Sequence, residues 1–304
     1  MKKKRSVVAV LKSDYSGLYS NLEKIITLCE GLEINSKNNN VVIKINLCDA
    51  RTPETGAITH PLFLDALLKF LRENYENLKI FVAESDATVV LADKFIKWFG
   101  FLPVLKKWNA KWVNLSKEEL TTKKINGLFL KEIQLPKILC DNVYFISLAK
   151  LKTNLLTKIS CSLKNQFGCL PEIEKNVYHS HINKVIADIN SVIKPDFSLV
   201  DGIIAMGGTQ GPAFGTPIGT ELIIGGKDPV AVDACCAKIM GFKPYLVPHV
   251  RKSNAQGIGS LRYEQVGDDI KKINFEIKKW EISLFLLGSS LKKRVMRRTR
   301  SGNK

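Results

Sequence analysis

Segments typical of strands and of helices alternate through the first half of this chain, and this alternation limits its fold more than any other feature. The strand-like segments span residues 6–11, 41–47 and 79–84, and the helix-like segments span residues 18–29, 61–72 and 92–99. Such alternation is typical of a parallel sheet with crossover helices. We therefore expect an α/β fold with a largely parallel sheet and a crevice, which two lobes could flank.

The second half of the chain extends the same pattern after an irregular stretch. Residues 105–136 indicate a peripheral strand and a hairpin that turns at Asn126-Gly127. Further strands are expected at 142–148, 197–204 and 221–225, with helices at 178–193 and 228–240. Thr59 and Asp228 are the expected caps of the helices that follow them.

Length and composition fit a globular protein of one large or two ordinary domains. The chain has 304 residues, of which 45% are hydrophobic, enough to build a core. We expect a family domain over residues 1–280, with a sub-boundary near 105–140, and an amphipathic basic segment over 281–304. No apolar run reaches the roughly 20 residues of a membrane span, and the N-terminus is a poor signal peptide. These features favour the cytoplasm.

The net charge of +17 is concentrated at the two ends of the chain. Residues 2–5 contribute four positive charges and residues 292–304 contribute seven, which leaves +6 for the body. Basic tails of this kind suit a polyanion such as RNA, or an acidic membrane surface. The plainer interpretation is that the tails only solubilise the protein.

Seven cysteines are present, but their spacing does not indicate a metal or cluster site. The sequence contains no Cys-x-x-Cys motif, which zinc and iron–sulfur sites commonly use. An odd number of cysteines in an intracellular chain favours reduced thiols. We expect no iron–sulfur cluster within this chain, and the identity of any other cofactor stays open.

Lysines in and beside expected buried strands are the strongest indication of a binding site. Lys44 lies within the strand at 41–47 and shares its face with Asn46, while Lys150 and Lys152 come just after the run 143–148. Lys164 and Asn165 follow soon afterwards. Buried lysines need a partner, and the carboxyl ends of parallel strands open onto the ligand crevice. These residues predict a pocket for an anion, unless the lysines pair with buried carboxylates such as Glu84, Asp201 or Asp233.

Other polar residues supply weaker candidates. The glycine-rich segment 207–217 could bring backbone amides to a phosphate through its glycines, namely Gly207, Gly208, Gly211 and Gly215. His179 suits a general acid or base, and a metal site at His179-Ser-His181 lacks accompanying ligands. Asp201, at a strand's carboxyl end, is a second candidate for proton transfer. The plainer interpretations are a structural loop and ordinary helix-start residues.

Several of these motifs together resemble the prokaryotic family called "domain of unknown function 362". They are Lys44-Ile-Asn46, Lys150 and Lys152, the segment 162–168, His179, Asp188, the segments 200–202, 211–217 and 228–233, and Met240-Gly241. The resemblance covers about residues 40–267. Many members carry an added ferredoxin-like module with two iron–sulfur clusters, which implies a redox link.

The chain departs from the family pattern at two points. It lacks the ferredoxin cysteines, so electrons would have to come from a separate ferredoxin-type donor. Asn154 also stands where members often have a histidine.

Three functions are therefore open. The first is an enzyme of unspecified reaction class that acts on a small anionic ligand, carboxylated or phosphorylated. Its candidate catalytic residues are Lys152, Lys164, His179 and Asp201, with Lys44, Asn46, Lys150, Asn165 and the four glycines binding the ligand. The second is an RNA-associated or RNA-modifying protein that uses its basic tails. The third is a non-catalytic subunit of a redox assembly.

Overall fold

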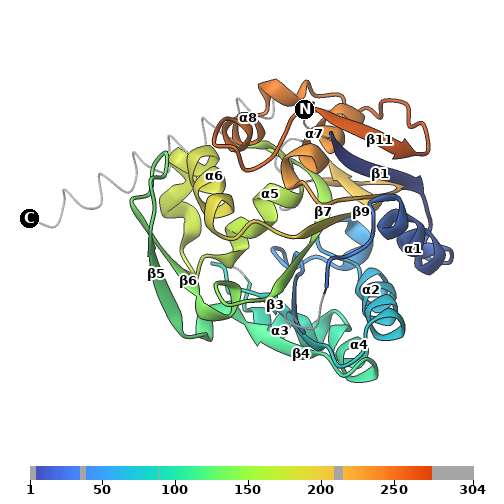
Figure 1. Ribbon diagram of the computed structural model, residues 1–304, viewed down its shortest axis with the longest axis horizontal. Helices are drawn as coiled ribbons and strands as arrows, with labels where there is room; N and C mark the ends of the chain where they lie inside the picture. Colours follow the sequence, from blue (N-terminus) through green and yellow to red (C-terminus); the bar gives the residue numbers. More distant parts are fainter. Residues whose placement is uncertain (1–4, 35–38, 89, 209–214, 276–304) are drawn as a thin grey trace, which may run out of the picture.

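The computed structural model describes residues 5–34, 39–88, 90–208 and 215–275. A nine-stranded sheet runs through the molecule (Figure 1). Its strands lie in the order β11 (Tyr263–Gly267), β1 (Ser6–Lys12), β10 (Thr216–Gly226), β9 (Phe197–Gly207), β7 (Tyr144–Asn154), β2 (Asn40–Lys44), β3 (Lys79–Glu84) and β4 (Lys111–Asn114), with β8 (Lys158–Ser160) paired to β7.

Most neighbouring strands in this sheet are parallel, which confirms the predicted fold class. The pairs β1–β11, β9–β7, β7–β2, β2–β3 and β3–β4 are parallel. Strand β10 runs antiparallel to both β1 and β9, and β8 runs antiparallel to β7. The carboxyl ends of the parallel strands therefore lie at one edge of the sheet, where α/β proteins bind ligands.

Helices cover both faces of the sheet, and each face has its own hydrophobic core. One core packs against α1 (Leu18–Leu28), α2 (Pro61–Asn74), α3 (Ala92–Trp98) and α4 (Phe101–Lys107). The other packs against α5 (Ser162–Asn165), α6 (Ile182–Val192), α7 (Pro229–Ile239) and α8 (Pro248–Ala255). Successive residues of β1 alternate between the two cores, as expected for a strand buried on both faces.

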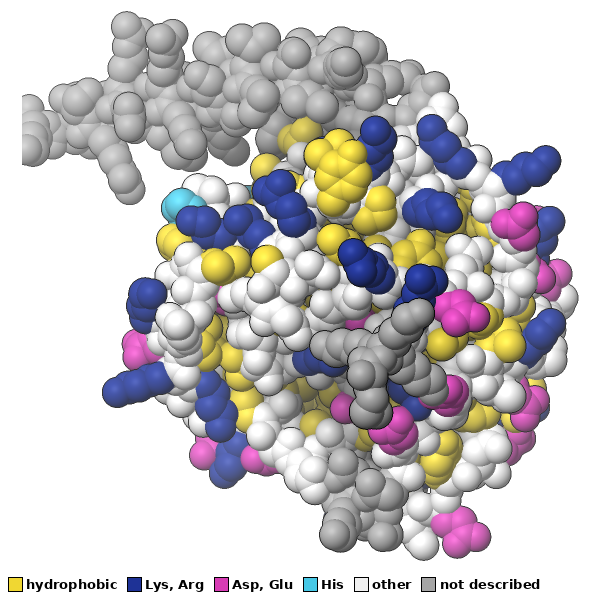
Figure 2. Space-filling view, turned by 45° about the horizontal axis from the view of Figure 1, so that its top comes forward, with side chains coloured by type: hydrophobic (Ala, Val, Ile, Leu, Met, Phe, Trp, Pro, Cys, Tyr) yellow, Lys and Arg dark blue, Asp and Glu magenta, His cyan; other side chains and the backbone are white. Residues whose placement is uncertain are grey.

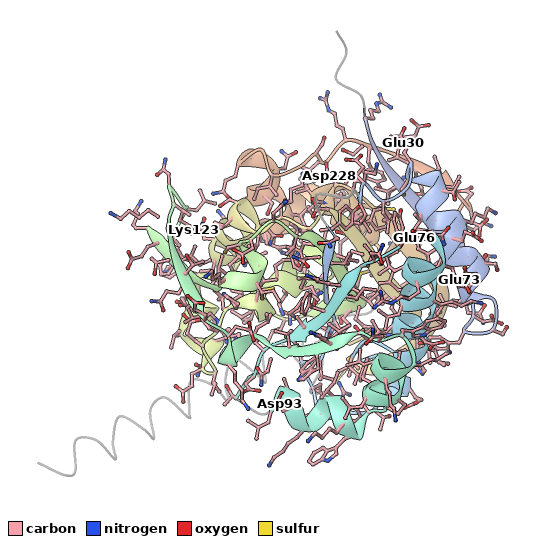
Figure 3. The ribbon with its side chains drawn as sticks, turned by 60° about the horizontal axis from the view of Figure 1, so that its bottom comes forward. Glu30, Glu73, Glu76, Asp93, Lys123 and Asp228 are labelled. Carbon is pink, nitrogen blue, oxygen red and sulfur yellow. The ribbon has the colours of Figure 1, made fainter. Side chains whose placement is uncertain are left out.

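Short 3₁₀ helices occupy several of the connections. They are η1 (Pro53–Thr55), η2 (Leu115–Lys117), η3 (Lys137–Leu139), η4 (Gln166–Cys169), η5 (Lys175–His181) and η7 (Pro244–Leu246). The hairpin β5 (Leu120–Lys124) and β6 (Glu132–Pro136) forms a separate two-stranded sheet. Figure 3 shows Lys123 on this hairpin, at the outside of the molecule.

Two of the predicted element boundaries are wrong in ways that affect the site. Strand β7 continues to Asn154, so Lys150 and Lys152 lie inside the strand and not after it. The helix expected from residue 178 begins at Ile182, because the preceding turns form η5. A buried strand tolerates these lysines only because each ammonium finds protein acceptors.

One predicted helix cap is confirmed and the other is wrong. Asp228, labelled in Figure 3, accepts hydrogen bonds from the backbone N–H groups of Val230 and Ala231 at the start of α7. The cap of α2 is His60, whose Nδ1 accepts from Leu62 N at 3.2 Å. The Thr59 hydroxyl is used elsewhere: it accepts from Asn46 N and donates to the Leu148 carbonyl.

In the described part of the chain, no helix is both long and apolar enough to cross a bilayer. The basic segment expected at residues 281–304 lies outside the described residues.

Candidate anion-binding pocket

A cavity of about 230 Å³ lies at the carboxyl ends of β2 and β3. Four lysines contribute to its lining, Lys44, Lys152, Lys164 and Lys175, and Glu84 is the one carboxylate among the described lining residues. We call this cavity the lysine pocket. It occupies the edge of the sheet at which the sequence predicts a crevice.

Lys44 and Glu84 form a buried ion pair in the wall of the lysine pocket. Lys44 Nζ lies 2.6 Å from Glu84 Oε1 and also donates to the Ile45 carbonyl at 2.8 Å. The Glu84 carboxylate accepts from Leu47 N and Ser85 N, each at 2.9 Å. The pair is therefore fixed by the backbone that follows β2 and β3.

Lys152 is held by neutral groups alone. Its ammonium donates to Asn46 Oδ1 and to the Ala57 carbonyl, both at 2.7 Å, and contacts Cys48 Sγ at 3.2 Å. Asn46 in turn donates to Asn165 Oδ1 at 3.3 Å. The positive charge of Lys152 thus remains without a carboxylate partner among the described residues.

Asn165 is a positioning residue beneath the lysine pocket. It is buried, and its amide donates to the Lys44 carbonyl at 3.0 Å and to Ser147 Oγ at 3.1 Å. These bonds tie the short helix α5 to the end of β2 and to the first half of β7. Asn46 and Asn165 therefore position the lysines. Because their amide groups are used in these bonds, few of their donors and acceptors are free for a ligand.

Lys164 differs from the other lysines because its ammonium has no hydrogen bond or ion pair within the described part of the chain. Burial lowers its pKa to about 8, the nearby thiol of Cys48 partly offsets this, and the charge of Lys152 lowers the pKa further. An amine with this pKa is partly neutral near physiological pH. Lys164 can therefore act as a base or a nucleophile.

His179 lies at the rim of the lysine pocket, in η5. His179 is partly open to solvent; the part of its side chain that is buried and the charge of Lys164 both lower its pKa. An imidazole in this position can exchange protons with a bound ligand. In the described residues, no group of three or more His, Cys, Asp or Glu residues is placed to hold a metal ion.

Lys175 is a pocket residue that the sequence analysis missed. Its ammonium is buried and donates to the carbonyls of Asp86 (2.7 Å) and Glu172 (2.6 Å). Burial lowers its pKa, although Glu84 lies near enough to oppose that effect. Lys175 follows an irregular segment and precedes a helix. Neither the alternation of a strand nor a motif spacing therefore indicated it as a site residue.

Lys150 and Asp201 lie outside the lysine pocket, where they pair with each other. Lys150 Nζ donates to Asp201 Oδ2 at 2.7 Å, and both side chains are fully buried. Burial lowers the pKa of Lys150 and the charge of Asp201 opposes this. The alternative of pairing with buried carboxylates therefore describes Lys44 and Lys150, but not Lys152 or Lys164.

None of the described glycines of the glycine-rich segment is among the described lining residues. Gly207 ends β9, and the Gly208 carbonyl accepts from the Thr153 hydroxyl at 2.5 Å. The Gly215 carbonyl accepts from Arg51 at 2.9 Å. Gly211 lies outside the described residues. The described glycines thus have structural contacts, and their predicted part in anion binding remains untested.

The remaining histidines and Asp188 occupy structural positions. His181 stacks on Phe129 with ring centroids 4.3 Å apart, and His249 is buried with Nε2 3.6 Å from Asp233. The Asp188 carboxylate accepts from three consecutive backbone N–H groups, those of residues 128–130. It therefore anchors the turn between β5 and β6 to α6.

Known proteins resemble this chain in sequence and in structure. A family model described as "Domain of unknown function (DUF362)" matches residues 41–238. The Thylakoid-associated protein sll1697 of Synechocystis sp. is 26% identical over 268 residues, which cover 84% of this chain and 81% of that protein. The lactate racemase apoprotein from Thermoanaerobacterium thermosaccharolyticum aligns over 77% of this chain with 13% identity and a TM-score of 0.42, and the alignment spans 57% of that protein.

Proposed function

This chain belongs to the DUF362 family, as its motifs predicted, and on that premise we propose that it is an enzyme that binds and converts a small anion in the lysine pocket. The anion carries a carboxylate or a phosphate group. The observation that carries this proposal is the surplus of positive charge and of unused N–H donors in the lining.

Unused donors are counted from the three N–H groups of each lysine ammonium. Lys44 uses two on Glu84 and the Ile45 carbonyl, and Lys175 uses two on backbone carbonyls. Lys164 uses none within the described residues. Each of the first two therefore keeps one N–H for a ligand, and Lys164 keeps all three.

The charge balance of the lining supports the same conclusion. Four lysines face one glutamate, which leaves three formal positive charges when every amine is protonated. A cation that is taken out of water without a counter-charge costs free energy. A carboxylate or phosphate would supply the missing charge, and charge-assisted hydrogen bonds to such a group are the strong ones.

The chemistry of the pocket favours proton transfer or nucleophilic attack. Lys164 supplies a partly neutral amine, because burial lowers its pKa to about 8. His179 at the rim can pass protons between the ligand and solvent. Lys150 and Asp201 are left out of this scheme because they pair with each other outside the lining.

Two earlier expectations remain predictions. A separate ferredoxin-type donor follows only from the family resemblance. RNA association rests on the basic termini, of which residues 1–4 and 276–304 lie outside the described structure.

Calorimetric titration with pyruvate and with inorganic phosphate tests the proposal. We expect both probes to bind, and Lys164→Met and Lys175→Met each to weaken binding by about 10- to 100-fold, the loss of one charge-assisted hydrogen bond. Lys24→Met removes an exposed lysine on α1 and serves as the matched control. Binding by neither probe, or equal binding by all variants, would overturn the proposal.

A further inference from the structure

Lys164 is unpaired although the residues around it are tightly fixed. Asp233 accepts from the backbone N–H groups of Ser162 (2.7 Å) and Leu163 (3.2 Å), and the Ser162 hydroxyl lies 2.6 Å from that of Ser198. On the other side, Asn165 is bound to the Lys44 carbonyl. The helix α5 that carries Lys164 is therefore held from both ends, and the free amine is built into the site.

The groups around this amine divide into two sets. The pKa of Lys164 responds to Lys152 and to Cys48, and the charge of Lys164 in turn lowers the pKa of His179. Lys44, Glu84 and Lys175 interact with one another. One set thus contains the reactive amine, and the other contains two lysines that each keep one free N–H donor.

Lys164 carries far more neutral amine than an ordinary lysine. With a pKa of about 8, about a quarter of it is neutral at pH 7.5, which is roughly 200-fold more than for an unperturbed side chain. Leu47, Phe167 and Ile173 supply an apolar part of the lining. Such surroundings disfavour charge on the amine.

We propose that Lys164 forms an imine with the carbonyl carbon of a small oxo acid whose carboxylate is held by Lys44 and Lys175. This inference rests on the proposed function and names its substrate class. The cavity volume of about 230 Å³ favours a small oxo acid.

The step balances without an added reagent. The lone pair of the neutral amine attacks the carbonyl carbon, a C–N bond forms, and the carbonyl oxygen takes up a proton to give a carbinolamine. The nitrogen loses one proton, the hydroxyl takes up a proton and leaves as water, and a protonated C=N bond remains. His179 exchanges these protons with the ligand and solvent. No group is oxidised or reduced, and the imine is the electron sink that later bond cleavage or proton abstraction needs.

Reductive trapping tests this inference on the full chain. The protein is incubated with pyruvate and sodium borohydride, which reduces an imine to a stable secondary amine, and is then analysed by intact mass and peptide mapping. We expect one adduct per chain, located on Lys164, and its loss in Lys164→Met and Lys164→Gln. The control Lys24→Met should be labelled like the unmodified chain.

A second arm uses acetaldehyde, which has a carbonyl group but no carboxylate. At a pyruvate concentration below saturation, Lys175→Met should lower the yield of the pyruvate adduct on Lys164 at least tenfold. The same variant should leave the yield of the acetaldehyde adduct on Lys164 unchanged. Calorimetric binding of pyruvate without an adduct on Lys164 would overturn the imine and spare the proposed function. If peptide mapping finds the acetaldehyde adduct on other lysines and not on Lys164, the imine would also be overturned. Failure of pyruvate and phosphate to bind at all would instead overturn the proposed function.

Discussion

The buried lysines of this chain have contrasting surroundings, and the contrast lies in the partners of their ammonium groups. Lys150 has a buried carboxylate at 2.7 Å, whereas Lys164 has no partner among the described residues. A paired lysine contributes to the fold, because its loss leaves a buried charge behind. A lysine that is unpaired and whose pKa is strongly lowered by burial is instead a candidate for a functional site.

The buried pair gives the first prediction. Lys150→Met should lower the free energy of unfolding by about 3–5 kcal/mol, because it leaves Asp201 charged and fully buried. The double variant Lys150→Met/Asp201→Asn should recover much of this loss, since the amide carries no charge. Urea denaturation of the two variants measures both values. Equal destabilisation by the single and double variants would show that the ion pair is not the cause.

Lys164→Met should have the opposite effect on stability. Because the pKa of Lys164 falls from 10.5 to about 8 on folding, the unfolded chain binds this proton more tightly than the folded chain does. The stability of the folded chain therefore rises with pH between about 8 and 10.5. Below pH 8 the charged Lys164 destabilises the fold to its full extent. The variant should melt at a higher temperature than the unmodified chain at pH 7, and this difference should shrink at pH 10. A difference that is the same at both pH values would contradict the assignment.

At the scale of elements, the turn from α5 into η4 brings the backbone against the Lys44–Glu84 pair. A Cβ at Gly168 would lie 2.8 Å from both Glu84 Oε1 and Lys44 Nζ. Gly168→Ala should therefore destabilise the protein by about 1–3 kcal/mol and weaken phosphate binding. Gly219→Ala is the control, because a Cβ there meets no atom within 4 Å, and it should change stability by less than about 0.5 kcal/mol. Thermal unfolding of both variants measures the contrast, and equal stabilities would contradict it.

The elements were largely predictable, but their contacts were not. Strand β3 has the predicted bounds, because β-branched and apolar residues between turns mark a buried strand. Strand β7 was predicted too short, because Lys150 and Lys152 hide its apolar pattern. Their acceptors come from other segments, as Asp201 and Ala57 show. The local sequence pattern carries no information on such long-range pairings. It could identify the lysines as candidate site residues, but it could not show which of them are paired and that Lys164 is not.

At the scale of the whole molecule, charge is divided between the body and the termini. The described body carries Lys and Arg over much of the face shown in Figure 2, but residues 2–5 and 292–304 supply eleven of the positive charges in the sequence. The proposed anion binding in the lysine pocket and the predicted polyanion binding by the termini can therefore be tested separately.

Removal of residues 292–304 tests the RNA alternative. If this basic segment binds RNA, the deletion should weaken binding to a poly(U) probe and lower the slope of log affinity against log salt by up to about five, since seven charges are lost. Filter binding over a range of salt concentrations measures that slope. Phosphate binding in the lysine pocket should not change. An unaltered slope would exclude this segment as an RNA contact.

The unpaired charge of Lys164 is the feature on which the proposed function most depends, and its titration can be followed by NMR of ¹³C-labelled lysine side chains. One lysine should titrate near pH 8, its signal should be missing in Lys164→Met, and its pKa should rise when phosphate is added, because an anion stabilises the charged amine beside Lys152. A Lys164 signal that titrates like an ordinary lysine, or that does not respond to phosphate and pyruvate, would contradict an anion-binding pocket built around this residue.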